Sequence, residues 1–515
     1  MYRVSKSELT LIFFVMIFFT SGGFFSFDFP QLFEDEIIKE FDVTSVQVQF
    51  LYTMYALPNF IALFFGTFAF NYIGLALGIC FTTAFITLGT LTTFLAFTTN
   101  SFVLLAISRG IYGLGNELAI TAQFTIAERW FAGKMLSFAQ GMCRSVSFLV
   151  TFLSFYIGPQ MLIRTKSMDL SLTIYCLMGG FGMLTAIFYT FLEKIWGNRQ
   201  KRQDLEKEKE EELKRLAQEN ENEEEKVPEG EEEENETEKR ITTTTATSET
   251  YKEGKFTLGM VRHLGLLYYL LIITFGLGSM CYLIFISFST DCLVHRFGYT
   301  YEDAKNKLSV LSIISMVSMP ILSFFIGKYG KKGWVLLLAF LLSALNFTLM
   351  LSFPREPGNY VYCIVVLTSL MDSVFVAVIW PCMTLSVPPK ATAIALGLGL
   401  TMQNICNSTL PTYFGIITKP RTAEAYNIAL ISLLVVSLVS CLLSILVIIV
   451  DCRTGQLLNL PENDPRVTKM REKIALKFED IINKNRSIKD SKVDYRSIGQ
   501  QSSKTGKTTE TGKVE

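Results

Sequence analysis

Apolar residues dominate the chain from Thr10 to Val450, in segments of about twenty residues that carry few charges. A helix of about twenty residues crosses roughly 30 Å of hydrocarbon, because each residue adds about 1.5 Å. A long charged stretch from Lys194 to about Lys255 interrupts this pattern once. The pattern therefore predicts an integral membrane protein with two helical halves.

We predict an all-α membrane protein with twelve transmembrane helices in two six-helix bundles, read in windows of about 19 residues. The first bundle spans 8–28, 47–70, 74–97, 102–127, 135–158 and 169–193, and the second spans 262–289, 306–327, 334–353, 360–386, 391–416 and 425–450. The predicted domains are an N-terminal bundle over 1–193, a charged linker over 194–256, a C-terminal bundle over 257–450 and a basic tail over 451–515. The linker cannot bury enough apolar surface to fold, so we expect it to be disordered.

Charge is segregated along the chain, although the formal net charge is zero. Lys and Arg cluster at alternate connections, such as Arg129 with Lys134 and Lys328 with Lys331. By the positive-inside rule, both termini and the linker are expected in the cytosol. The acidic connection after the first span, which includes Asp28, is expected outside the cell or in an organelle lumen.

Several function classes lose support from motifs that are missing. The two histidines, His263 and His295, stand in no metal-ligand spacing. The sequence has no GxxxxGK[ST] loop for nucleotide phosphates and no GxSxG or HExxH signature. We expect no enzyme, no metal, no cofactor and no nucleic-acid partner.

Four charged residues lie inside predicted spans, where charge is costly and usually marks a pathway or a paired site. Arg109 and Glu117 are on the fourth span, Arg144 is on the fifth and Asp372 is on the tenth. Glu117 and Arg144 are each about ten residues, or roughly 15 Å, from the connection that joins their spans. They are expected to form a structural ion pair, or to flank a cavity as separate partners for a substrate amine and a substrate carboxylate.

Asp372 is a candidate proton acceptor or amine ligand, and a hydrogen bond between helices is the alternative. Other polar residues in the spans are candidates for the same cavity, with packing between helices as their commoner role. They are Gln403, Asn404, Asn407, Tyr52, Tyr55 and Tyr282. Gly110, Gly113 and Gly115 are expected to let helix backbones approach closely.

The stretch SRGIYGLGNE at 108–117, followed by WFAGK at 130–134, resembles the major facilitator superfamily and its RxxxGxG pattern. Four further stretches resemble, more narrowly, the lysosomal dipeptide transporter group called major facilitator superfamily domain-containing protein 1. They are HRFGYTYEDA at 295–304, IGKYGKKGWV at 326–335, AVIWPCMTLSVPP at 377–389 and DCRTGQLLN at 451–459.

This resemblance implies two bundles that rock about a site at the bilayer midplane. It implies that Glu117 helps to bind a dipeptide amino terminus, and that Arg144, about one turn from the family's arginine, binds the carboxylate. It also implies lysosomal residence and a glycosylated accessory subunit. The chain departs from the family at the cytosolic loops, where Phe70 and Asn71 replace Asp and Arg and Gly327 replaces a second Asp.

The leading hypothesis is a secondary transporter, a uniporter for small zwitterions such as dipeptides or amino acids, that works by alternating access. Its expected partners are the solute, membrane lipid and the accessory subunit. A proton-coupled carrier of organic anions or sugars is one alternative, and a membrane receptor or scaffold that transports nothing is another. Residues 495–498, Tyr-Arg-Ser-Ile, match a YxxΦ lysosomal sorting signal.

Overall fold

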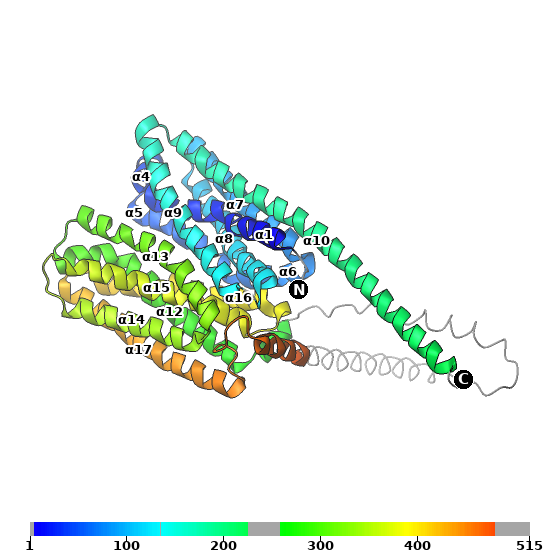
Figure 1. Ribbon diagram of the computed structural model, residues 1–515. Helices are drawn as coiled ribbons and strands as arrows, with labels where there is room; N and C mark the ends of the chain where they lie inside the picture. Colours follow the sequence, from blue (N-terminus) through cyan, green and yellow to red (C-terminus); the bar gives the residue numbers. More distant parts are fainter. Residues whose placement is uncertain (1–4, 134, 225–257, 479–515) are drawn as a thin grey trace, which may run out of the picture.

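The computed structural model describes residues 5–133, 135–224 and 258–478, and every regular element within these ranges is helical (Figure 1). The N-terminal half consists of α1 (Lys6–Phe18), α2 (Ser21–Ser26), α3 (Phe29–Leu32), α4 (Glu34–Phe41), α5 (Ser45–Ala56), α6 (Asn59–Ile73), α7 (Leu75–Thr98), α8 (Phe102–Phe131), α9 (Leu136–Thr165) and α10 (Met168–Glu224). The C-terminal half consists of η1 (Leu258–His263), α12 (Leu266–Phe297), α13 (Tyr301–Tyr329), α14 (Lys332–Ser352), α15 (Tyr360–Leu385), η2 (Pro389–Ala391), α16 (Thr392–Thr418) and α17 (Ala423–Thr454).

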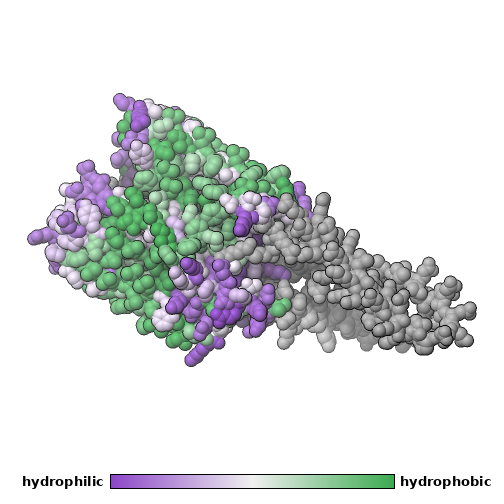
Figure 2. All heavy atoms as spheres, in the orientation of Figure 1, coloured by the Kyte–Doolittle hydropathy of each residue, from purple (hydrophilic) through white to green (hydrophobic). Residues whose placement is uncertain are grey.

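The helices are built to lie in lipid. Within the described residues, ten helices are long and apolar enough to cross a membrane. The predicted spans 47–70 and 391–416 are not among these ten, and they fold as α5 with α6 and as α16. Figure 2 shows a broad hydrophobic band between hydrophilic ends. Hydrocarbon offers no hydrogen bonds to the backbone, so a helix that satisfies its own backbone is the stable form there.

Two of the predicted spans each consist of two helical segments. The first is divided into α1 and α2, with a turn at Phe19 and Thr20. The second is divided into α5 and α6 at Leu57 and Pro58. The proline has no backbone N–H to continue the hydrogen-bond ladder, so the helix restarts after it.

The charged linker also begins differently from the expectation. Helix α10 continues past the predicted end of its span at residue 193 as far as Glu224. The added part is rich in Glu, Lys, Arg and Gln, which are strong helix formers, and it extends a helix that is already nucleated. The rest of the predicted linker, 225–256, lies outside the described residues.

Local capping signals mark the starts of several helices. Ser5 and Glu8 form a capping box at α1, and Thr300 and Thr422 accept backbone hydrogen bonds at the starts of α13 and α17. Helix α9 begins after Met135, and the Met135 side chain forms no cap.

The two halves meet toward one end of the molecule. We call this end, where Ser5 and the chain after α17 lie, the terminus-side face, and we call the opposite end the far face (Figure 1). Contacts between α9 and α13 extend from the terminus-side face, at Phe138, to the depth of Arg144, at Ser145. Ser145 Oγ donates a hydrogen bond to the Met316 carbonyl at 2.6 Å, and the Phe138 and Phe324 rings are 6.2 Å apart. In Figure 1 the two groups of helices diverge toward the far face.

Candidate functional site

Glu117 is the buried acid at the centre of the N-terminal half. Its side chain lies on α8 with 8% of the residue exposed, and Oε1 accepts a hydrogen bond from the Tyr55 hydroxyl at 2.6 Å. The Asn116 amide donates to the same hydroxyl at 3.0 Å. The Tyr55 hydroxyl therefore bridges the neighbouring amide and the carboxylate, and it fixes the orientation of the acid.

Close packing of α8 against α5 and α7 makes this arrangement possible. A methyl group on Gly113 would strike the Tyr55 carbonyl, and one on Gly115 would come within 2.5 Å of the Thr82 carbonyl. The glycine spacing predicted such an approach between helix backbones, and these two positions confirm it. The absent side chain at Gly113 brings α5 close enough for Tyr55 to reach Glu117, one helical turn further along α8.

Arg144 lies across from this acid, on α9. Its guanidinium is 5.0 Å from the centre of the Phe148 ring and 5.6 Å from that of Phe24, and the residue is partly exposed. It interacts electrostatically with both Glu117 and Asp372. Among the ion pairs of the described residues, however, none joins Arg144 directly to either acid. Of the two arrangements open from the sequence, the direct ion pair between Glu117 and Arg144 is not found among the described residues.

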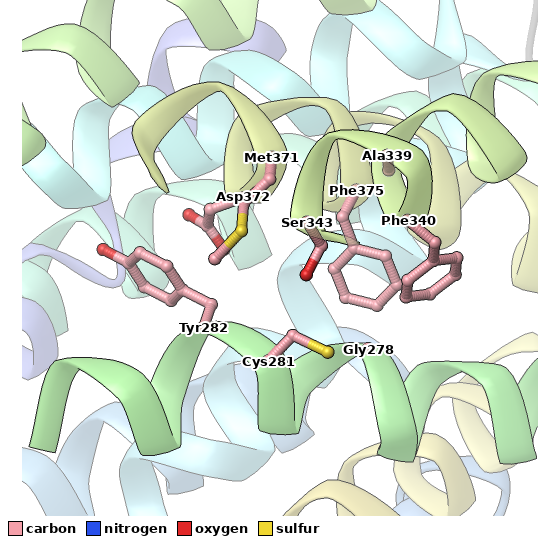
Figure 3. A pocket seen from close by; sticks show the side chains of 9 residues that line it. All are labelled: Gly278, Cys281, Tyr282, Ala339, Phe340, Ser343, Met371, Asp372 and Phe375. Carbon is pink, nitrogen blue, oxygen red and sulfur yellow. The ribbon is translucent and has the colours of Figure 1, made fainter. Parts of the chain in front are cut away.

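Asp372 brings a second buried acid from the C-terminal half. It lies on α15 with 5% exposure, and its Oδ2 atom has no hydrogen-bond partner. Tyr282, on α12, interacts electrostatically with both Asp372 and Arg144. Figure 3 shows the Tyr282 hydroxyl and the Asp372 carboxyl toward one end of a small cavity, whereas Phe340 and Phe375 line the other end.

Helix α16 supplies a further polar group to this centre. Asn404, 7% exposed, lies beside the Glu117 carboxyl although the two residues belong to different halves. Gln403 is partly exposed. Successive helix residues are rotated by about 100°, so Gln403 points from a different side of α16 than Asn404 does. The side chain of Asn407 lies outside the described part of the structure.

Arg109 and Tyr52 belong to a neighbouring group nearer the far face. Arg109 donates hydrogen bonds to the carbonyls of Ser26 and Phe27, at 3.0 and 2.7 Å, and stacks 4.7 Å from the Tyr112 ring. It therefore satisfies backbone carbonyls at the end of α2, which have no partner inside a helix. Tyr52 interacts electrostatically with Arg109 and with Asp28.

An aromatic layer closes the centre on the terminus-side, and sequence reasoning missed it. Phe124 of α8 and Trp380 of α15 stack with ring centres 4.2 Å apart, and Phe275 lies 5.1 Å from Trp380. Each stacked ring follows a buried acid of its own helix, Glu117 or Asp372, by about two turns. That common spacing was the available signal, since it places an aromatic residue at the same depth in each half.

Charged groups held between two helical halves, with the halves in contact on one side, define a class of protein: a multi-pass membrane transporter that performs no covalent chemistry. The Major Facilitator Superfamily model matches residues 11–411, and the chain belongs to this family.

Known relatives and solved structures agree with this class. The chain is 23% identical over 424 residues to the lysosomal dipeptide transporter MFSD1 of Danio rerio, covering 80% of this chain and 81% of that one. It is 22% identical over 440 residues to MFSD1 of Homo sapiens, covering 83% of this chain and 84% of the relative.

The fold itself resembles two solved carriers. A bacterial homologue of the iron transporter ferroportin, in an outward-facing state, superimposes with a TM-score of 0.61 at 13% identity, covering 85% of this chain and 98% of that one. The proton:xylose symporter XylE gives a TM-score of 0.56 at 14% identity, with coverage of 85% and 94%. At such identities the likeness supports the fold alone.

Proposed function

We propose that this transporter carries small zwitterionic solutes, dipeptides or amino acids, by alternating access. One observation supports this most: Glu117 on α8 and Arg144 on α9, an acid and a base, interact electrostatically but make no direct ion pair among the described residues. In the proposal, Glu117 binds the solute amine and Arg144 binds its carboxylate.

The physical argument rests on the cost of unpaired charge. A charged side chain inside the membrane is retained when it gains a partner or serves a pathway. Opposite charges that stay apart in a medium of low dielectric constant bind strongly to a molecule that brings both complementary charges. A zwitterion brings both at once, whereas a sugar brings neither and an organic anion leaves the acid without a partner. The relatives named as dipeptide transporters favour dipeptides among zwitterions.

Both halves contribute to the proposed site, as rocking about a central site requires. Tyr55 orients the Glu117 carboxylate, and Asn404 reaches the same acid from the other half. Asp372 and Tyr282 face Arg144 from the C-terminal half. A bound solute would thus touch both halves and couple its own position to their movement. Arg109 and Tyr52 act indirectly in this proposal, by holding the end of α2.

Blocked dipeptides separate the roles of the two charges. Uptake into proteoliposomes is measured for a free dipeptide, its N-acetyl form and its C-terminal amide, with wild type, Glu117→Gln and Arg144→Gln. Each substitution is expected to reduce uptake of the free dipeptide about 10- to 100-fold, as for the loss of a hydrogen bond to a charged group. Glu117→Gln should add little further loss for the acetylated form, and Arg144→Gln should add little for the amide.

Two exposed residues provide matched controls. Arg164 lies on α9 like Arg144, and Glu424 lies at the start of α17, and both are exposed. Arg164→Gln and Glu424→Gln should leave uptake unchanged. Equal losses for all three peptides in Glu117→Gln would contradict the proposed amine contact, and no uptake of any zwitterion by wild type would favour a receptor or scaffold.

We further propose uniport rather than proton coupling. Uptake that persists after an imposed proton gradient is collapsed would support this, and uptake that disappears with the gradient would support the coupled alternative.

The proposed location is the lysosomal membrane, with the terminus-side face in the cytosol and a glycosylated accessory subunit at the far face. The names of the relatives support the location, and the positive-inside rule supports the orientation. The sorting motif at 495–498 lies outside the described residues. Microscopy of Tyr495→Ala tests the location, since the variant should move away from lysosomes. Purification from lysosomal membranes should recover a glycoprotein bound to the wild-type chain.

A further inference from the structure

The chain after α17 crosses the terminus-side face, and we call residues 455–478 the C-terminal strap. Backbone hydrogen bonds fasten the strap to the end of α13, the start of α14 and the turn between them. They run from Lys331 N to Asn459 O at 3.0 Å, from Lys332 N to Leu458 O at 3.0 Å and from Glu462 N to Gly327 O at 3.1 Å. Asp451, on α17, also accepts hydrogen bonds from Leu458 N and Asn459 Nδ2, both at 3.0 Å. The strap is therefore a fixed part of the C-terminal half.

Glu462 reaches from this fixed strap into the other half. Its carboxylate is 2% exposed and accepts hydrogen bonds from the Ser137 backbone N–H at 3.0 Å and from the Ser137 hydroxyl. Ser137 is the second residue of α9, so its N–H has no partner within the helix. Because Met135 provides no cap, a carboxylate from the C-terminal half caps a helix of the N-terminal half. A negative charge is favourable there, at the positive end of the helix dipole.

The surroundings of Glu462 fit this role. Lys332 Nζ lies 3.6 Å from Oε1 and is fully buried, so the carboxylate keeps a cation on its own half. Gly327 leaves room for the acid, because a side chain at that position would come within 3.2 Å of Oε2. The buried charge thus has one partner on each half.

A second link lies further along the strap. Arg471 forms an ion pair with Glu128 at the terminus-side end of α8, and the two side chains are 11% and 5% exposed. Side chains of the strap thus form an ion pair with α8 and hydrogen bonds with α9. By contrast, Asp464 pairs with Arg466 of the strap itself, at 2.7 Å.

We propose that the C-terminal strap is a latch that holds the two halves together at the terminus-side face and must release when they part there. The links to the C-terminal half include three backbone hydrogen bonds and persist, whereas the links to the N-terminal half depend on side chains that can separate. On release, Glu462 retains Lys332, and the Ser137 N–H gains water. The latch depends on the two halves moving and not on the identity of the solute.

Distances between the halves test the latch directly, without any solute. Spin labels are placed in the full chain at Ile195→Cys and Tyr329→Cys, which are 41% and 60% exposed on different halves. The exposed cysteines Cys363 and Cys452 are replaced by Ser. Electron–electron double resonance then compares wild type with Glu462→Gln, Ser137→Ala and Asp464→Asn.

Glu462→Gln is expected to raise the ratio of long to short distances about tenfold or more, because it removes a charged cap. Ser137→Ala keeps the backbone N–H and should raise the ratio only about two- to fivefold. Asp464→Asn removes a carboxylate from the same strap and should leave the distances unchanged. If Glu462→Gln does not give a monodisperse protein, the distances measured in Ser137→Ala test the latch instead. The proposal would be overturned if the variant that folds kept the wild-type distance distribution. It would also be overturned if Asp464→Asn changed the distances as much as Glu462→Gln or Ser137→Ala does.

Discussion

Two regions of the molecule treat buried charge in opposite ways. At the terminus-side face the acids are paired: Glu128 with Arg471 and Glu462 with Lys332. At mid-depth, Glu117 and Asp372 are buried and Arg144 is partly exposed, yet none of the ion pairs of the described residues joins them. Paired charges satisfy one another and hold helices together. Charges kept apart retain the capacity to bind something else, which is what a transporter needs at its centre.

Removal of one partner from the paired region should have the largest effect on stability. Glu128→Gln leaves the Arg471 guanidinium mostly buried without its acid, and such losses cost about 3–5 kcal/mol. The midpoint of thermal unfolding of the purified protein should fall clearly. Glu117→Gln provides the contrast, because the amide can still accept from Tyr55 and no ion pair is broken, so its midpoint should stay close to that of wild type. An equal fall in the unfolding midpoint of the two variants would contradict the proposed difference between the paired and the central charges.

Transport should show the reverse order of sensitivity. Arg144→Lys keeps the positive charge but loses the planar group that binds a carboxylate through two hydrogen bonds. We expect kcat/KM for a zwitterionic dipeptide to fall about tenfold, since one charged hydrogen bond contributes about 1.5 kcal/mol or more. Arg129 pairs with Glu193 in a partly exposed position. Arg129→Lys should therefore change uptake by less than about twofold. A larger loss in the Arg129 variant would argue that the central arginine has no special role.

The geometry of the centre can be disturbed without any change of charge. Gly113→Ala places a methyl group against the Tyr55 carbonyl, so α5 must shift away from α8. Overpacking of this kind costs about 1–3 kcal/mol and should separate Tyr55 from Glu117. We expect a lower unfolding midpoint together with weaker dipeptide binding. Gly180→Ala is the control, because a methyl group there meets nothing within 4 Å.

The smallest effect should come from the exposed pair in the strap. Hydrogen bonds from Arg466 hold the pKa of the Asp464 carboxyl below its ordinary value of 3.8. Because the folded pKa is the lower one, the pair stabilises the fold above pH 3.8 and loses this contribution as the pH falls further. Asp464→Asn should lower the unfolding midpoint slightly at pH 7, and the difference from wild type should shrink at pH 3. A difference that grows at pH 3 would contradict this sign.

Much of the fold could be predicted because the length of an apolar segment indicates directly whether it can cross the membrane as a helix. The all-helical class and the positions of most spans follow from runs such as those now seen as α7 and α17. The breaks within the first two spans were not predicted, since a hydropathy window averages over local effects such as that of Pro58. The full length of α10 was not predicted either, because the hydropathy signal ends where the charged residues begin. For the site, equal depth along α8 and α9 predicted that Glu117 and Arg144 lie at one level, and in the structure the two side chains interact electrostatically.

The sequence by itself determined that this chain lies in a membrane as two sets of helices, and that charged side chains lie within them, because both follow from the composition of single segments. Only the tertiary structure decided which charges meet. Whether Arg144 pairs with Glu117, whether Arg109 caps α2, and whether Glu462 reaches Ser137 depend on how helices rotate and on segments hundreds of residues apart. Such contacts arise from packing between elements, and no window along one segment contains that information.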